Sequence, residues 1–223
     1  MVEDHIVKEM VHEGVLFGHK RSKTHPKMRP HIGGTKNEIE LLNPESVEES
    51  LSRAIEFLKG KKTAGGVFLL VGTKPSAKGQ IQEFASAFSF PCVTNRWLGG
   101  TITNFPMIQK RIVYYEDLKA KQATGGFDKY TKKEQRKFIE EAQKMRQNFE
   151  GITPLKKVPD VLFFVDANAS KTAIREARRA GVPSVGILDT NDDPTLVDYP
   201  IFANDHSVKS VEWVMKHIKE GIV

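Results

Sequence analysis

Short, uninterrupted apolar runs set the strongest limit on how this chain can fold. Val67–Val71 lies between Gly66 and Gly72, and the runs Val161–Val165 and Val185–Leu188 have the same character. A continuous apolar run is typical of a strand that is buried on both faces. Helix-like patterns separate the runs, and this alternation predicts an α/β domain with right-handed crossovers and a central parallel sheet covered on both faces.

The bounds of the expected elements follow from apolar spacing and from the Gly and Pro residues between segments. The expected helices span residues 3–13, 44–59, 75–88 and 170–180, and a terminal helix begins after Ser207. The expected strands span residues 37–42, 67–71, 90–93, 161–165 and 185–188, with a short last one at 201–203.

Residues 105–150 interrupt this alternation with two helical patterns, each of which carries one apolar stripe at heptad-like spacing. The stripes consist of Ile108, Ile112, Tyr115 and Leu118, and of Phe138, Ala142, Met145 and Phe149. Thr131 and Glu134 match a capping box at the start of the second helix. We therefore expect an inserted antiparallel coiled-coil helical hairpin at 105–150 and an α/β globular domain formed by residues 1–104 and 151–223.

Basic residues concentrate in two regions. Between Phe17 and Asn37 there are six Lys or Arg residues and no acid, with His19, His25 and His31 among them. The Pro and Gly residues of this segment predict a basic N-terminal loop at 17–37, either merely solvated or, as we favour, binding an anion. The hairpin adds outward-facing cations at Lys110, Arg111, Lys119, Lys121, Lys129, Lys132, Lys133, Arg136 and Lys137.

The connection Asn95–Phe105 joins the first half of the α/β pattern to the hairpin. Gly99 and Gly100 allow a positive φ or a close backbone approach. Asn104 is a good N-cap for the helix that begins at Phe105. A structural hinge is the simplest interpretation, and a hinge that also faces a partner is the other.

Composition narrows the class of partner. The net charge of +6 favours an anionic partner, with a phosphate backbone first and a membrane surface second. The single cysteine, Cys92, excludes a disulfide framework and a multi-cysteine zinc site. No apolar run approaches the roughly 20 residues of a membrane span. The acidic start Val2-Glu3-Asp4 does not match a secretory signal, so we expect a cytoplasmic protein.

Two segments are similar to ligand sites but lack residues that such sites need. Gly72–Gly79 lies where a P-loop would follow a strand, yet Ala77 replaces the Gly before the Lys and Gly79 replaces the hydroxyl residue after it. Asp189–Pro194 begins like a calcium loop but has Pro where Gly is required. An ion site stays open at this edge of the sheet, with Asp189, Asp205 and His206 as candidate ligands.

We find no catalytic constellation, since His12-Glu13 lacks a second zinc-binding His and Cys92 has no evident base. The sequence therefore predicts no catalytic residue, no metal and no cofactor. Two classes of function remain: a nonenzymatic RNA-binding structural protein, and an α/β enzyme or binding protein for a phosphorylated small molecule at the sheet switch point.

Six motifs in order along nearly the whole chain resemble the bacterial-type small-subunit ribosomal protein two family. Asn-Arg-Trp-Leu-Gly-Gly at 95–100 with Thr-Asn at 103–104 is the most specific. The others are Gly14–His19, Pro26–Pro30, Phe127–Glu134, Pro159–Phe163 and Asp189–Pro194. The resemblance implies a flavodoxin-like three-layer domain that carries a coiled-coil hairpin.

The resemblance also implies binding to small-subunit rRNA and to other small-subunit ribosomal proteins, including docking of small-subunit protein one. We expect no membrane partner and no homo-oligomer. Trp97 is the expected packing anchor of the connection, with Arg96 facing RNA. The candidate RNA-binding residues are His19, Lys20, Arg21, Lys23, Lys27, Arg29, Asn95, Arg96, Lys110 and Arg111.

Overall fold

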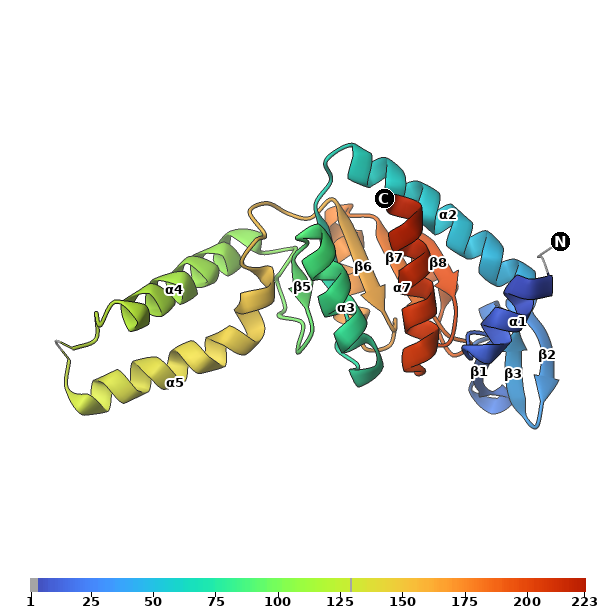
Figure 1. The fold of residues 1–223 in the computed structure, drawn as a ribbon, viewed down its shortest axis with the longest axis horizontal. Coiled ribbons are helices and arrows are strands. Elements are labelled where there is room, and N and C mark those ends of the chain that lie inside the picture. The colour runs from blue at the N-terminus through green and yellow to red at the C-terminus, as the bar shows by residue number, and fades with distance from the viewer. Residues whose placement is uncertain (1–3, 129) are drawn as a thin grey trace.

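The computed structural model describes residues 4–128 and 130–223 and is elongated, with a helical hairpin that projects from an α/β body (Figure 1). The expectations for residue 3 and for Lys129 lie outside the described residues. None of the helices in those two ranges is long and apolar enough to cross a membrane.

The helices and strands alternate through most of the chain. The helices are α1 Asp4–His12, α2 Pro44–Thr63, α3 Pro75–Phe88, α4 Phe105–Ala123, α5 Lys132–Phe149, α6 Lys171–Ala180 and α7 Val208–Ile222. The strands are β1 Phe17–Lys20, β2 Ile32–Lys36, β3 Ile39–Leu42, β4 Phe68–Val71, β5 Cys92–Val93, β6 Val161–Val165, β7 Ser184–Leu188 and β8 Tyr199–Phe202. Four 3₁₀ turns join them: η1 Arg21–Lys23, η2 Pro26–His31, η3 Glu150–Ile152 and η4 Pro194–Leu196.

The central sheet has five parallel strands in the order β5-β4-β6-β7-β8. Numbered from β4, this order is 2-1-3-4-5, which is the flavodoxin-like arrangement. The prediction of an α/β fold with a flavodoxin-like parallel sheet is confirmed.

The apolar runs divide their side chains between the two faces of this sheet, because successive residues of a strand point to opposite sides. Phe68 and Leu70 pack in one core with α2, α3 and α7, whereas Leu69 and Val71 pack in a second core with α6. Helices therefore cover both faces of the sheet and form the three layers; Figure 1 shows α3 and α7 in front of the sheet.

The prediction that residues 17–37 form a loop is wrong, because β1, two 3₁₀ turns and β2 lie in this segment. β1 and β2 pair antiparallel with β3 in a separate three-stranded sheet of order β1-β3-β2. The strand expected at 37–42 exists as β3, but it belongs to this small sheet and not to the parallel one. Asn37 and Glu38 both have positive φ, at 49° and 65°, as in the tight two-residue turns that join β-hairpins.

Thr190 attaches the small sheet to the body. Its side-chain hydroxyl accepts a hydrogen bond from the His19 backbone at 2.8 Å, and its carbonyl accepts one from the His25 backbone at 2.8 Å. A Cβ atom at Gly18 would collide with the Thr190 side chain, so this approach requires glycine.

α4 and α5 lie side by side and antiparallel in the projecting hairpin (Figure 1). The first stripe is buried, and Ala142, Met145 and Phe149 of the second are buried with Phe138 partly so. The Thr131–Glu134 capping box is confirmed. Asn104 holds the N-cap position of α4, but its side chain makes no capping hydrogen bond, which corrects that prediction.

Candidate nucleic-acid interface

The basic segment, residues 17–36, presents most of its cations to solvent because Met28 anchors it from beneath. Met28 is fully buried, and η2 around it begins at Pro26, with the His25 ring accepting a hydrogen bond from the Lys27 backbone. The charged residues on the outside of this segment are exposed: Lys20, Arg21, Lys23, Lys27, Arg29 and Lys36.

Lys27 differs from the others because its ammonium group already has partners. Its Nζ lies 2.9 Å from Asp193 Oδ2 and 2.7 Å from the Thr195 hydroxyl oxygen. Burial alone would raise the pKa of Asp193, but the hydrogen bonds from Lys27 and Thr195 lower it to about 2. Lys27 therefore ties η2 to the loop after β7.

His19 turns toward the body instead of toward the basic surface. Its Nδ1 lies 3.0 Å from Asp189 Oδ2, and its Nε2 lies 3.0 Å from Nε2 of His206. The neighbouring Asp189 carboxylate raises the pKa of His19 against the opposing effect of burial. Of the residues predicted in this segment, His19 alone belongs to an inward-facing polar cluster.

That cluster collects four buried carboxylates at the carboxyl ends of β6, β7 and β8, from Asp166, Asp189, Asp192 and Asp205. The Lys74 Nζ lies 2.5 Å from Asp166 Oδ2 and 3.3 Å from Asp205 Oδ2. Burial raises the pKa of both Asp192 and Asp205 to about 6. Repulsion among the acids adds to the effect, and Lys74 opposes it.

Two groups in the described part of the chain bring ligand atoms within 4.8 Å of one another, namely His19, Asp189 and His206, and Asp166, Asp192 and Asp205. The three candidates from the sequence are therefore divided, with Asp205 in the second group. Imidazole nitrogens with a carboxylate suit zinc among divalent ions. The second group already has the Lys74 ammonium as its cation.

The sheet switch point lies between β4 and β6, where Lys74 and Asp166 form their ion pair. Four carboxylates surround this position, and such a setting repels a phosphate. Lys78, the second cation of the P-loop-like segment, donates to Asn95 Oδ1 at 2.8 Å. Both cations that could have met a phosphorylated ligand here, Lys74 and Lys78, already have partners within the protein.

Asn95 and Arg96 have different roles at the base of the hairpin. The Asn95 side-chain amide donates to the Gln147 carbonyl at 2.6 Å, so Asn95 links α3 to α5. Arg96 is exposed, and its guanidinium makes no hydrogen bond or ion pair with any residue in the described ranges. Arg96 is therefore available to an external anion.

Glu176 of α6 organises the connection, although it was not among the residues predicted from the sequence. Its buried carboxylate accepts hydrogen bonds from the Trp97 indole at 3.0 Å and from the Gly100 backbone at 2.8 Å. The Ile102 backbone and both the backbone and the hydroxyl of Thr103 complete the set. Burial alone would raise the pKa of Glu176, but these donors lower it.

A signal for Glu176 existed in the sequence. It lies between Ala173 and Ala177 on the apolar face of α6, where an acid needs a partner. Trp97 itself is half-buried and packs against the core that contains α6. Gly100 adopts φ 89°, the positive value that its position in the turn allows.

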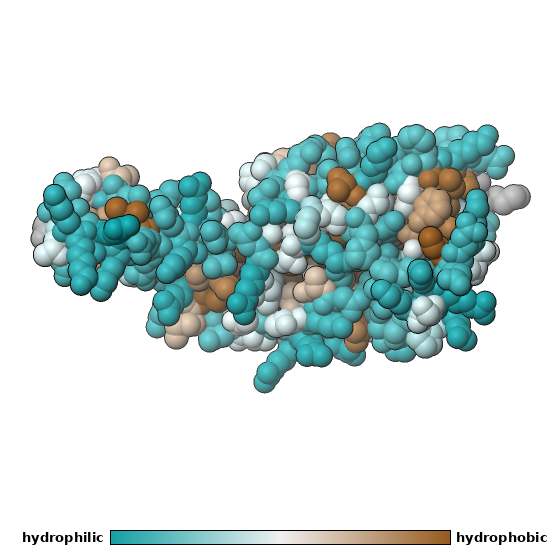
Figure 2. Space-filling model, turned by 90° about the horizontal axis from the view of Figure 1, so that it is seen from below, coloured by the Kyte–Doolittle hydropathy of each residue, from teal (hydrophilic) through white to brown (hydrophobic). Residues whose placement is uncertain are grey.

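The hairpin forms a second basic region, separate from the first. Lys110 and Arg111 are exposed on α4, and Figure 1 places the hairpin at the opposite end of the molecule from β1–β3. The face seen in Figure 2 is mainly hydrophilic over the hairpin. The predicted RNA-binding residues therefore lie on two separate basic surfaces, one on the basic segment and one on the hairpin. Asn95 and Arg96 lie in the connection at the base of the hairpin.

Comparisons with known proteins agree on one family. A family model described as Ribosomal protein S2 matches residues 10–223. Small ribosomal subunit protein uS2 of Rhodopirellula baltica is 39% identical over 218 residues, which are 98% of this chain and 84% of that protein. The protein of the same name from Coprothermobacter proteolyticus is 37% identical over 97% of this chain and 81% of its own. Small ribosomal subunit protein uS2c of Emiliania huxleyi is 39% identical over 96% of this chain and 94% of its own.

Proposed function

The chain belongs to the ribosomal protein S2 family, and we propose that it binds small-subunit rRNA through the outward cations of residues 17–36 and of the hairpin. It is a structural component of the small ribosomal subunit, not an enzyme, and serves translation as a ribosome-associated, cytoplasmic protein.

One observation carries the rRNA-binding proposal. Five exposed cations have side chains without a hydrogen bond or ion pair to any other described residue: Lys20, Arg21, Lys23, Arg29 and Lys36. The small sheet and the buried Met28 hold the backbone beneath them. Exposed cations without an ion-pair partner in the protein, carried on an ordered backbone, are typical of a protein that binds a phosphate backbone.

The salt dependence of rRNA binding tests this proposal. Each phosphate contact should contribute about 0.9 to the slope of log affinity against log salt on duplex RNA-like polyanions. Alanine at Lys20, Arg21, Lys23, Lys27 and Arg29 together should flatten the slope by several units, with Lys27 contributing least because Asp193 already neutralises it.

A matched variant controls for loss of charge alone. Arg175, Arg178 and Arg179 are exposed on α6, and their replacement by alanine should change the slope little. An unchanged slope in the fivefold variant, or an equal loss per charge in the α6 variant, would contradict the assignment of the basic segment.

We also propose that one copy of this chain provides the docking site for small-subunit protein one and contacts neighbouring ribosomal proteins. The family resemblance supports this step. Small subunits reconstituted without the chain should lose protein one and regain it on addition of the purified chain. Full occupancy by protein one in its absence would contradict the docking role.

A phosphorylated small-molecule ligand at the switch point is the weaker alternative. Lys74 is paired with Asp166 and Asp205, and the surrounding acids disfavour a phosphate.

A further inference from the structure

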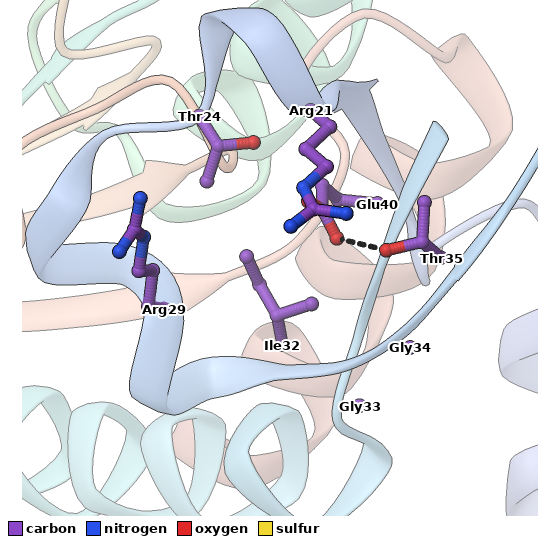
Figure 3. Close-up of a pocket in the computed structure, with 8 residues that line it drawn as sticks. All are labelled: Arg21, Thr24, Arg29, Ile32, Gly33, Gly34, Thr35 and Glu40. Carbon is purple, nitrogen blue, oxygen red and sulfur yellow. Dashed lines mark hydrogen bonds between the residues drawn. The ribbon is translucent and has the colours of Figure 1, made fainter. Parts of the chain in front are cut away.

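An open cavity beside the small antiparallel sheet combines cationic and anionic groups. Its volume is about 420 Å³, and its lining includes Arg21, Thr24, Arg29, Ile32, Thr35 and Glu40. Figure 3 shows the guanidinium groups of Arg21 and Arg29 and the Thr24 hydroxyl around one opening, with Glu40 and Thr35 on its wall. Arg21 and Arg29 are candidate RNA-binding residues from the sequence, whereas Glu40 was not a candidate.

The polar groups of this cavity are incompletely satisfied. The Thr24 hydroxyl oxygen is buried and has no hydrogen-bond partner within the described residues. Glu40 is 6% exposed, and its carboxylate accepts a hydrogen bond from the Thr35 hydroxyl at 2.8 Å. Because buried polar groups are nearly always hydrogen-bonded, this wall has capacity for a further polar partner.

The combination of charges points to a particular ligand chemistry. Two guanidinium groups favour a phosphate, which they can contact with paired N–H donors. A buried carboxylate in the same cavity repels a bare phosphate or an acidic peptide, but it accepts a hydrogen bond from an amino group such as that of cytosine. A nucleotide carries both the phosphate and the amino group.

A neighbouring cavity extends this site along the small sheet. It has a volume of about 550 Å³ and is lined by Lys20, Arg21, Ser22, Thr35 and Glu38. Arg21 and Thr35 line both cavities. Each volume lies within the range of about 300–1,000 Å³ that is usual for small-molecule sites, so each has room for one nucleotide.

We propose that these two cavities bind consecutive unpaired nucleotides of single-stranded RNA, and that Glu40 selects a base with an exocyclic amino group. This inference rests on the proposed RNA-binding function and names the form of RNA that the basic segment reads. Arg21, between the cavities, contacts the phosphate that joins the two nucleotides. Bases splayed out of a single strand are read in this way, by hydrogen bonds to their edges and by contact with arginine planes.

Binding of short oligocytidine and oligouridine to the full chain tests the proposal by fluorescence anisotropy. The two pyrimidines stack similarly, but only cytosine has the exocyclic amino group. Oligocytidine should bind about tenfold more tightly than oligouridine, a difference within the discrimination of one good base contact. Glu40→Gln should reduce that ratio to within about twofold, because the amide can also donate to the uracil carbonyl. Glutamine retains an acceptor for Thr35, which favours normal folding.

A second variant tests the predicted phosphate contacts, which do not involve Glu40. Arg21→Ala with Arg29→Ala should weaken both oligonucleotides and lower the salt slope by about 1.4, or about 0.7 for each lost contact on a single strand. Arg178→Ala with Arg179→Ala on α6 is the matched control and should leave both affinities unchanged. Equal binding of the two oligonucleotides by the parent chain, or equal losses in the two double variants, would overturn the proposal. Retained rRNA binding in that case would leave the proposed function standing.

Discussion

At the scale of single residues, Glu176 illustrates how one buried charge can order a loop. A carboxylate taken out of water needs donors, and five of them come from Trp97, Gly100, Ile102 and Thr103. These residues lie in the connection that leads into the hairpin, whereas Glu176 lies in α6. The conformation of the connection is thus fixed by a residue more than seventy positions away in sequence.

We expect Glu176→Gln to destabilise the protein by about 2–4 kcal/mol, since the amide presents donors to donors and loses charge-assisted hydrogen bonds. Urea unfolding at neutral pH measures this change. Glu212→Gln on α7 is the control, because Glu212 is exposed, and it should be nearly neutral. A small, equal effect of both substitutions would show that the carboxylate does not order the connection.

Alanine substitutions at Trp97 and Arg96 should separate an effect on folding stability from an effect on assembly into the small subunit. Trp97→Ala should cost about 2–4 kcal/mol, toward the low end for an aromatic because Trp97 is half-buried, with loss of the Glu176 hydrogen bond included. Arg96→Ala should change stability by less than about 0.5 kcal/mol, as exposed substitutions do. It should nevertheless weaken incorporation into small subunits.

Denaturant unfolding and subunit incorporation measure the two effects separately. If Arg96→Ala destabilised the free chain as strongly as Trp97→Ala, Arg96 would have a structural role and the RNA assignment would fail.

Residue identity allowed only part of the candidate site to be predicted. The exposed positions of Arg21 and Arg96 follow from local charge, because no acid lies close in sequence. The inward turn of His19 and the pairing of Lys27 depend on Asp189 and Asp193, which only the fold brings near. Long-range polar pairs of this kind leave no periodic signal.

At the scale of elements, long apolar patterns were predictable and the short polar strands were not. The strands at Val67–Val71 and Val161–Val165 can be recognised from the sequence as continuous apolar runs, because both of their faces are buried. β1 and β2 contain Gly and charged residues and are largely exposed. They are held by pairing with β3 and by Thr190, so their strand conformation comes from tertiary contacts that outweigh local propensity.

The hairpin should be separable from the body if its base is kept. Tyr115 and Ala142 line one pocket between α4 and α5, so removal of residues 116–141 with a short turn in their place cuts the two arms at the same level. Ile108 and Phe149, which share the core beneath the sheet, remain. We expect cooperative thermal unfolding at nearly the parent midpoint, because the deleted contacts are mainly internal to the hairpin.

Deletion of the whole of residues 105–150 is the informative comparison. It removes Phe105, Ile108 and Phe149 from the core and should lower the midpoint strongly. A molten product from the shorter deletion would mean that the distal arms also support the body.

At the scale of the whole molecule, the inward-facing polar cluster of His19, Lys74 and the four buried aspartates joins elements from both ends of the chain. His19 comes from β1, Lys74 from the start of α3, and the four aspartates from the ends of β6, β7 and β8. The cluster therefore links the small sheet, the parallel sheet and the approach to α7. Its protonation state should affect the stability of the entire fold.

The sign of that effect follows from the direction of the pKa shifts. Asp192 and Asp205 have pKa values of about 6 in the folded chain, above the ordinary value of 3.8. The folded state holds these protons more tightly, so their contribution to stability is complete below about pH 4 and is lost as the pH rises through about 6. Asp193, with a pKa of about 2, acts in the opposite sense and loses its contribution as the pH falls below 3.8.

We therefore expect Asp205→Asn to flatten the decline in stability between about pH 4 and 6.5. The rise in the pKa of Asp205 from 3.8 to about 6 corresponds to at most about 3 kcal/mol. Asp192 and Asp205 interact and titrate as a pair, so the observed change should be smaller. Urea unfolding across this pH range measures it, with Glu83→Gln on the exposed surface of α3 as the control. Parallel pH profiles for the parent and Asp205→Asn would show that the buried aspartates do not govern this part of the curve.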